Sequence, residues 1–122
     1  MRKRIVEIMD DYIYVGYETL DNELIGFLRL KIINNWLLEL EKFNVNQIYR
    51  RKGIGSKLLE TAINKATDLK YGKISLLCRE DNLAARSLYE KFGFIEEAFL
   101  EHHFDEFENM YVISKFLKER KK

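Results

Sequence analysis

The stretch that decides the fold of this chain reads Tyr49-Arg50-Arg51-Lys52-Gly53-Ile54-Gly55-Ser56. It connects an apolar, strand-like run that ends at Val45 to an amphipathic run that begins at Lys57. Its glycines can adopt positive φ and carry no Cβ, so backbone N–H groups of the turn and of a following helix can converge on a phosphate. The stretch therefore indicates an anion-binding turn. A strand-to-helix turn that needs glycine only for its geometry is the alternative interpretation.

Two common phosphate-binding loops are excluded by the order of the residues. A Walker loop ends in Gly-Lys-Ser/Thr, whereas the order here is Gly55-Ser56-Lys57. The dinucleotide-binding fingerprint requires a third glycine three residues after the second, and Leu58 occupies that position. The turn therefore belongs to another class of anion site.

Length and composition indicate one globular domain, residues 1–122, with enough chain to bury a core. The net charge of +1 gives no reason to expect nucleic acid or a membrane as a partner. The single cysteine, Cys78, lies in an apolar run, so we expect a buried core thiol rather than a nucleophile. One cysteine, without a signal peptide or an apolar stretch of membrane-spanning length, predicts a cytoplasmic protein.

Before the turn, the sequence predicts an antiparallel meander. Residues Arg4–Ile8 suit a short edge strand. Three further strands are predicted at Tyr12–Thr19, Leu24–Ile33 and Trp36–Val45, and Asp- and Asn-rich turns separate them.

The last strand of this meander contains a phase slip. Leu38 and Leu40 alternate on one face, but Phe43 and Val45 fall on the opposite parity. A β-bulge near residues 41–42 would place all four on one face and would free backbone N–H groups from the ladder. A strand that is buried on both faces is the alternative.

After the turn, a helix is predicted at Ser56–Leu69 because its apolar residues occupy one side. A short strand follows at Lys73–Arg79. Strand, turn, helix and strand form a βαβ unit, which requires parallel strands and a right-handed crossover. Ligands collect beyond the carboxyl ends of such strands, where the turn Tyr49–Ser56 stands.

A second helix is predicted with Asp81 or Asn82 as its N-cap and Gly93 just past its end. Residues 94–100 and 109–116 then predict two final strands.

Two motifs together carry a family resemblance. The first, Gln/Arg-x-x-Gly-x-Gly/Ala at a strand-to-helix turn, is met by Arg50, Gly53 and Gly55. The second, Asn-x-x-Ala at a helix start followed by Tyr and Gly-Phe, is met by Asn82, Ala85, Tyr89, Gly93 and Phe94. In their order and separation, these motifs resemble those of the GNAT superfamily of acyl-CoA-dependent N-acetyltransferases, over roughly residues 12–117.

The resemblance implies an α/β (α+β) fold. Its mixed central sheet would have antiparallel N-terminal strands, a βαβ unit around the cofactor turn, a second helix and a C-terminal β-hairpin. The co-substrate would be acetyl-CoA. The implied cofactor contacts are Val45, Arg50, Arg51, Lys52, Gly53, Ile54, Gly55, Ser56, Asn82 and Tyr89.

The same resemblance implies a role for each part of the site. Backbone amides of Arg51–Ser56 would hold the pyrophosphate, and Val45 would pair through its backbone with the pantetheine arm, while a bulge N–H would polarise the thioester carbonyl. Asn82 would contact the cofactor arm or the helix end. Tyr89 would protonate the departing thiolate, and a core tyrosine with its hydroxyl at the rim is the alternative.

The attacking amine must lose a proton. Glu39 falls where several members of the superfamily keep their base, and Glu41 lies two residues further on. Either could act directly or through water, or could simply face solvent. His102-His103 with Asp105 could suggest a metal site, but adjacent histidines usually point in opposite directions, and we expect none.

The implied activity is transfer of an acetyl group from acetyl-CoA to a primary amine, by direct attack in a ternary complex. The acceptor, a small molecule or a protein or peptide, stays open. Members of the superfamily usually place a strand and one or two helices before the first hairpin, whereas about eleven residues precede Tyr12 here. Three readings follow: an open site for a large substrate, a site completed by a partner chain or in a homodimer, or a non-catalytic acyl-CoA-binding or regulatory module.

Overall fold

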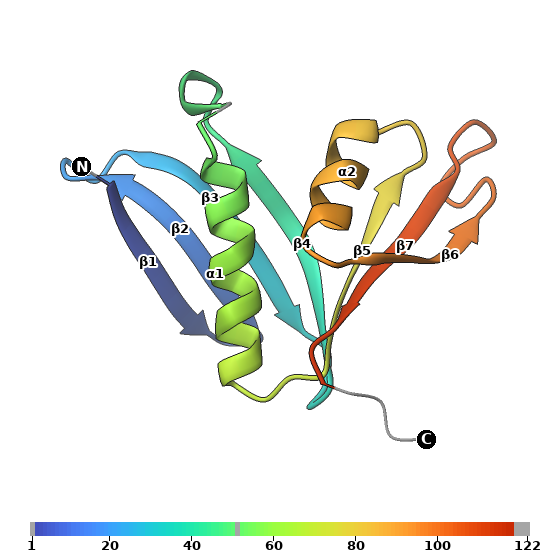
Figure 1. The fold of residues 1–122 in the computed structure, drawn as a ribbon, viewed down its shortest axis with the longest axis horizontal. Coiled ribbons are helices and arrows are strands. Elements are labelled where there is room, and N and C mark those ends of the chain that lie inside the picture. Colours follow the sequence, from blue (N-terminus) through green and yellow to red (C-terminus); the bar gives the residue numbers. More distant parts are fainter. Residues whose placement is uncertain (1, 51, 119–122) are drawn as a thin grey trace.

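The computed structural model describes the backbone of residues 2–50 and 52–118, and the side chains of residues 6–50 and 52–118. These residues form one mixed β-sheet with two α-helices (Figure 1). The strands are β1 Arg2–Met9, β2 Tyr12–Thr19, β3 Leu24–Ile32, β4 Leu37–Val45, β5 Lys73–Arg79, β6 Ile95–Leu100 and β7 Met110–Phe116. The helices are α1 Ile54–Asp68, α2 Leu83–Lys91 and the short 3-10 helix η1 Gln47–Tyr49.

The strand order in the sheet is β1-β2-β3-β4-β5-β7-β6. Strands β1 to β4 pair antiparallel, each with the next, which confirms the predicted meander. β4 and β5 pair in parallel and are connected through α1, which confirms the βαβ unit. β6 and β7 pair antiparallel, and β7 lies between β5 and β6. The expected α+β fold is therefore confirmed.

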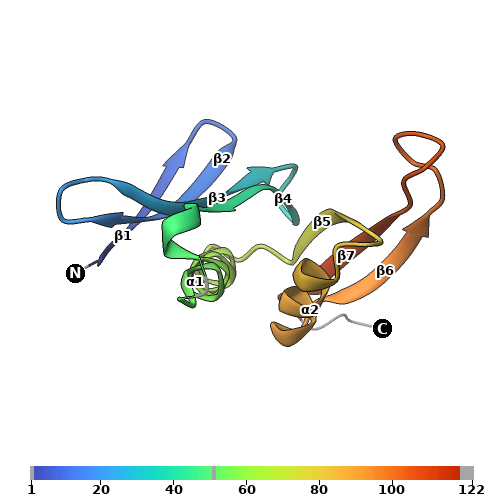
Figure 2. The same ribbon diagram turned by 90° about the horizontal axis from the view of Figure 1, so that it is seen from above.

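Both helices lie on the same face of the sheet (Figure 2). α1 packs on β2, β3 and β4, and α2 lies against the half of the sheet formed by β5, β7 and β6 (Figure 2). The layer between α1 and the sheet consists of inaccessible aliphatic side chains from both, among them Leu58 and Leu59 of α1 and Ile13, Val15, Leu28, Leu30, Leu38 and Ile74 of the strands. Burial of each large side chain stabilises the fold by roughly 1.5–3 kcal/mol. This packing holds the start of α1 beside the end of β4.

A β-bulge interrupts β4 at Glu41. Arg29 of β3 is paired with Lys42 of β4. The next residue of β3, Leu30, is paired with Leu40, so Glu41 is skipped. The bulge predicted near residues 41–42 is therefore confirmed.

The bulge places the apolar side chains of β4 on the face that α1 covers. Leu38 and Leu40 are buried, and Phe43 and Val45 pack against the same core. The alternative of a strand buried on both faces is wrong, because the opposite face is exposed at Glu39, Glu41, Lys42 and Asn44.

The helix ends lie close to their predicted positions. α1 begins at Ile54, earlier than the predicted Ser56, because the buried Ile54 side chain already belongs to the core. α2 begins after Asn82, whose Oδ1 accepts a hydrogen bond from the Ala85 N–H at 3.2 Å. Gly93 follows α2 with φ of 86°, as expected for a glycine just past a helix end.

Cys78 is buried in β5, which confirms the expected core thiol. Burial raises the pKa of this thiol above its ordinary value. In the described part of the chain, neither helix has the length and apolar character needed to cross a membrane.

Candidate active site

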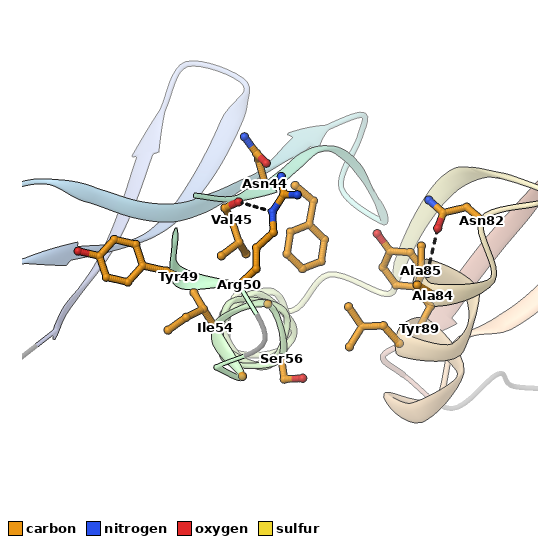
Figure 3. Close-up of a pocket in the computed structure, with 14 residues that line it drawn as sticks. Asn44, Val45, Tyr49, Arg50, Ile54, Ser56, Asn82, Ala84, Ala85 and Tyr89 are labelled. Atoms are coloured by element: carbon orange, nitrogen blue, oxygen red, sulfur yellow. Dashed lines mark hydrogen bonds between the residues drawn. The ribbon is translucent and has the colours of Figure 1, made fainter. Parts of the chain in front are cut away.

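A groove opens where β4 and β5 separate. The two strands pair only at their first residues, Leu37–Glu39 of β4 and Lys73–Ser75 of β5, and then diverge (Figure 1). The groove has a volume of about 590 Å³ and lies between the start of α1 and α2 (Figure 3). It is lined by Phe43, Asn44, Val45, Tyr49, Arg50, Gly53, Ile54, Gly55, Ser56, Asn82, Ala84, Ala85, Leu88 and Tyr89.

The turn before α1 forms one end of the groove. Gly53 is the N-cap of α1 and has φ of 76°, a left-handed conformation that other residues adopt only with strain. A Cβ at Gly53 would meet no atom within 4 Å, so the space beside it is open. The first turn of α1 contains no acidic residue. Free N–H groups at a helix start attract anions, so this end of the groove is suited to a phosphate.

Most residues predicted to contact the cofactor meet in this groove. They are Val45, Arg50, Gly53, Ile54, Gly55, Ser56, Asn82 and Tyr89. Lys52 does not line it, and its ammonium lies 5.9 Å from the centroid of the Tyr49 ring. Arg51 lies outside the described residues.

A hydrogen bond from Arg50 connects the turn to the end of β4. Its Nε donates a hydrogen bond to the Val45 carbonyl at 3.1 Å (Figure 3). Beyond Glu39, the edge of β4 that faces β5 has no strand partner among the described residues. Unpaired peptide groups on a strand edge can pair with an extended ligand. The free edge therefore offers a binding surface that leads along β4 away from the turn.

The opposite wall of the groove is the first half of α2. Asn82 lies at its start, and the small side chains of Ala84 and Ala85 leave room beside it (Figure 3). The resemblance predicts that Asn82 contacts either the cofactor arm or the helix end. The hydrogen bond to Ala85 shows the contact with the helix end, while the residue also lines the groove.

Tyr89 is the buried residue of α2, with 6% of its surface exposed. Its ring packs on Phe43, with the centroids 6.4 Å apart, and on Phe94, at 5.4 Å. Burial raises the pKa of its hydroxyl well above the ordinary value, and the nearby Cys78 adds to this shift. The hydroxyl points into the space between α2 and β4 (Figure 3). Tyr89 is therefore a neutral phenol at neutral pH, able to donate its proton into the groove.

The two predicted bases, Glu39 and Glu41, do not line this groove. Both lie on the face of the sheet opposite the helices. Glu41 forms an ion pair with Arg29, with Oε1 3.0 Å from the guanidinium nitrogen. Glu39 is exposed, and no ion pair joins it to any other described side chain.

The histidine pair lies in the long loop between β6 and β7. Asp105 accepts hydrogen bonds from the N–H groups of Phe107 and Glu108, both at 2.8 Å, and so shapes this loop. The described residues contain no group of three or more His, Cys, Asp and Glu side chains that could hold a metal ion.

Sequence reasoning assigned no cofactor contact to several groove residues, namely Phe43, Asn44, Ala84 and Leu88. Tyr49 and Ala85 also line the groove, and the sequence pointed to them only as parts of the turn and of the second motif. The phase slip in β4 was a usable signal for Phe43, since it places this ring on the helix side. The contact of Phe43 with Tyr89 joins residues far apart in the chain, and no local pattern reveals it.

The chain is similar in sequence to known acetyltransferases. The profile of the acetyltransferase (GNAT) family matches residues 3–94. Over 78 residues, 36% are identical to streptothricin acetyltransferase A of Bacillus subtilis (strain 168), covering 62% of this chain and 44% of that protein. Over 82 residues, 30% are identical to spermine/spermidine N(1)-acetyltransferase of the same strain, covering 61% and 54%. The chain spans about half the length of these curated relatives.

The fold also matches solved structures. One is spermidine N-acetyltransferase from Vibrio cholerae, described in complex with CoA and spermine. Its TM-score is 0.79 at 24% identity, and the match covers 88% of this chain and 67% of that one. At this identity the likeness shows a shared fold.

Proposed function

The chain belongs to the acetyltransferase (GNAT) family, and on that premise we propose that it transfers an acetyl group from acetyl-CoA to a primary amine. The observation that carries the proposal is the groove itself. It brings an anion-binding helix start, a free strand edge and a buried phenol into one cavity, and the phenol comes from a separate helix, α2. These are the groups needed to hold a pyrophosphate, an extended amide-containing arm and a leaving thiolate.

Acetyl-CoA fits the groups that line this groove. The amides that follow Gly53 would hold the pyrophosphate, and Arg50 adds positive charge at the same end. The free edge of β4 would pair with the amides of the pantetheine arm, as an added strand does. Phe43 and Leu88 would supply apolar contacts for the arm.

The chemistry we propose is direct attack in a ternary complex. The amine nitrogen attacks the thioester carbonyl carbon, a C–N bond forms, and the C–S bond breaks. An N–H of the bulged segment of β4 would stabilise the charge on the carbonyl oxygen. The departing thiolate would take the proton of Tyr89, which burial keeps protonated at neutral pH. Solvent would then return a proton to Tyr89.

We propose Glu39 as the group that accepts the proton lost by the amine, through water. Glu39 is exposed beside the point where β4 and β5 separate, and it has no ion-pair partner among the described side chains. Glu41 is the second candidate, but Arg29 competes for its carboxylate. Replacement of Glu39 by Gln should lower kcat about tenfold or more at neutral pH, with a smaller effect at alkaline pH, where the free amine predominates.

We further propose that the acceptor is a small cationic amine. The loop 101–109 between β6 and β7 carries four carboxylates and no Lys or Arg. It lies at the end of the sheet where β4 and β5 separate (Figure 1). One relative at 30% identity is named for spermine and spermidine. A protein or peptide amine is the competing acceptor.

We also propose that the protein acts in the cytoplasm, where a free thiol such as that of Cys78 stays reduced.

The experiment that tests the proposal follows release of free CoA from acetyl-CoA with a panel of polyamines, small amines and peptides. Cofactor binding and oligomeric state are measured on the same sample. Binding with amine-dependent release supports the acetyltransferase, and the best acceptor identifies the substrate class. Binding without release on any amine supports the non-catalytic module or a missing partner chain, and absence of binding contradicts the whole proposal.

A further inference from the structure

Arg29 occupies a singular place in the sheet, directly opposite the bulge of β4. Its partner on β4 is Lys42, and the pairing register shifts at the next residue of β3. The skipped residue, Glu41, turns its carboxylate back to Arg29, with 3.0 Å between the charged groups. The two β4 residues at the bulge are therefore linked to one β3 residue, one by strand pairing and the other by an ion pair.

The remaining contacts of Arg29 hold its guanidinium in place. The guanidinium carbon lies 4.3 Å from the centroid of the Tyr12 ring, a cation–π contact. Only 24% of the side chain of Arg29, and the same share of Glu41, is exposed. Tyr14, the partner of Arg29 on β2, also interacts with the guanidinium through its hydroxyl. Together with the Tyr12 ring, it restricts the positions available to the guanidinium and so to the Glu41 carboxylate paired with it.

This arrangement is not optimal for stability alone. The Nε of Arg29 is buried and has no hydrogen-bond partner among the described residues. An unsatisfied buried donor lowers the stability of the fold, and a partly exposed ion pair adds little stability to offset this loss. Departures of this kind from good local design are expected at functional sites. The location of Arg29 indicates what that function could be. Arg29 lies opposite the bulge, and the bulge lies on the part of β4 that diverges from β5 and borders the groove.

We propose that Arg29 is a positioning residue, which acts through Glu41 to fix the bulged segment of β4. This inference rests on the proposed acetyl transfer, in which an N–H of that segment meets the thioester carbonyl. Arg29 itself lies on the other face of the sheet and does not line the groove. A bulge can adopt more than one local backbone geometry, and the ion pair selects one of them.

The test compares Arg29→Met and Glu41→Gln with Arg86→Met. Arg86 is a matched control, because it too forms an ion pair, with Glu96 at 2.9 Å, and a cation–π contact, with Tyr111 at 4.5 Å. It lies on α2, does not line the groove, and has its contacts with Glu96, Tyr111 and Glu80, none of which belongs to β4. We expect Arg29→Met to lower kcat by about 10- to 100-fold, with the Kd for acetyl-CoA within about threefold of wild type. Arg29→Lys should recover part of kcat, and Arg86→Met should keep it.

A spectroscopic measurement separates positioning from loss of stability. Bound acetyl-CoA with a carbon-13 thioester carbonyl should show a lowered infrared carbonyl frequency in the wild type and in Arg86→Met. In Arg29→Met the frequency should move toward that of free acetyl-CoA. If Arg29→Met does not fold, Glu41→Gln, which removes only a charge, carries the same test.

The outcomes are distinguishable. A wild-type chain that neither binds acetyl-CoA nor releases CoA overturns the proposed function and this inference with it. If the wild-type chain catalyses the reaction but Arg29→Met and Glu41→Gln keep both kcat and the carbonyl frequency, only this inference is overturned. Equal loss of kcat in Arg29→Met and Arg86→Met also overturns it, because that loss would follow general destabilisation.

Discussion

Replacement of Tyr89 by Phe removes one oxygen atom from the wall of the groove. The ring contacts with Phe43 and Phe94 are retained, and the hydroxyl makes no hydrogen bond to another described residue. We therefore expect the free energy of unfolding to change by less than about 1 kcal/mol. Without the proton donor, the thiolate must leave unprotonated or take a proton from water. General acids of this kind contribute roughly 10²- to 10⁴-fold, so kcat should fall about 10²- to 10³-fold, or roughly 3–4 kcal/mol in the barrier.

The assay measures kcat from CoA release with the best acceptor, and the Kd for acetyl-CoA by calorimetry on the same sample. Tyr111→Phe is the control, since Tyr111 is a partly buried tyrosine that packs on Phe99 outside the groove. We expect Tyr89→Phe to keep its cofactor affinity and lose turnover, and Tyr111→Phe to keep both. If Tyr89→Phe retains kcat within about twofold of wild type, the acid role is refuted and Tyr89 is a packing residue.

Three further predictions follow from the structure. Gly53→Ala should fold with a modest loss of stability of about 1–2 kcal/mol, because φ is 76° there, yet should weaken acetyl-CoA binding by more than about tenfold, which calorimetry measures. Gly72→Ala should destabilise the chain by about 1–3 kcal/mol, because the added Cβ would overlap the ring of Trp36. Trp36 is the single tryptophan, so its fluorescence reports the displacement. An unchanged emission maximum and an unchanged Tm would contradict this packing. The chain should lose stability at alkaline pH, because the folded state holds the Tyr89 proton more tightly than the unfolded state does, an effect that begins above about pH 10. Burial also raises the pKa of Cys78, which adds a loss that begins above about pH 9. Urea unfolding at about pH 8 and pH 10.5 checks this, since Tyr89→Phe should show a smaller loss than wild type, and an equal loss in both would contradict the assigned shift.

The sequence predicted those features whose cause is local. The parity of Leu38 and Leu40 against Phe43 and Val45 located the bulge, because side chains alternate strictly along a strand. The amide of Asn82 at the start of α2 and the glycine after its end were visible from capping preferences. The strand-to-helix turn was recognised because glycines and cations are adjacent there.

Features that depend on tertiary pairing were not predictable. The ion pair of Arg29 with Glu41 depends on the register between β3 and β4, which the sequence does not reveal. It changes the interpretation of Glu41 from an available base to a paired carboxylate. Lys52 does not line the groove, and its ammonium lies over the ring of Tyr49. This placement likewise depends on the conformation of the turn and not on its composition.

The most direct test of the central claim is a titration of the isotopically labelled chain with CoA, followed by amide NMR. The account predicts that the largest shift changes occur at the amides of Gly53, Gly55 and Ser56, and along the free edge of β4 up to Val45. It also predicts that Gly53→Ala, which weakens binding, strongly reduces the changes at the turn at a CoA concentration near the wild-type Kd. Shift changes confined to surfaces outside the groove, or no changes at saturating CoA, would contradict it.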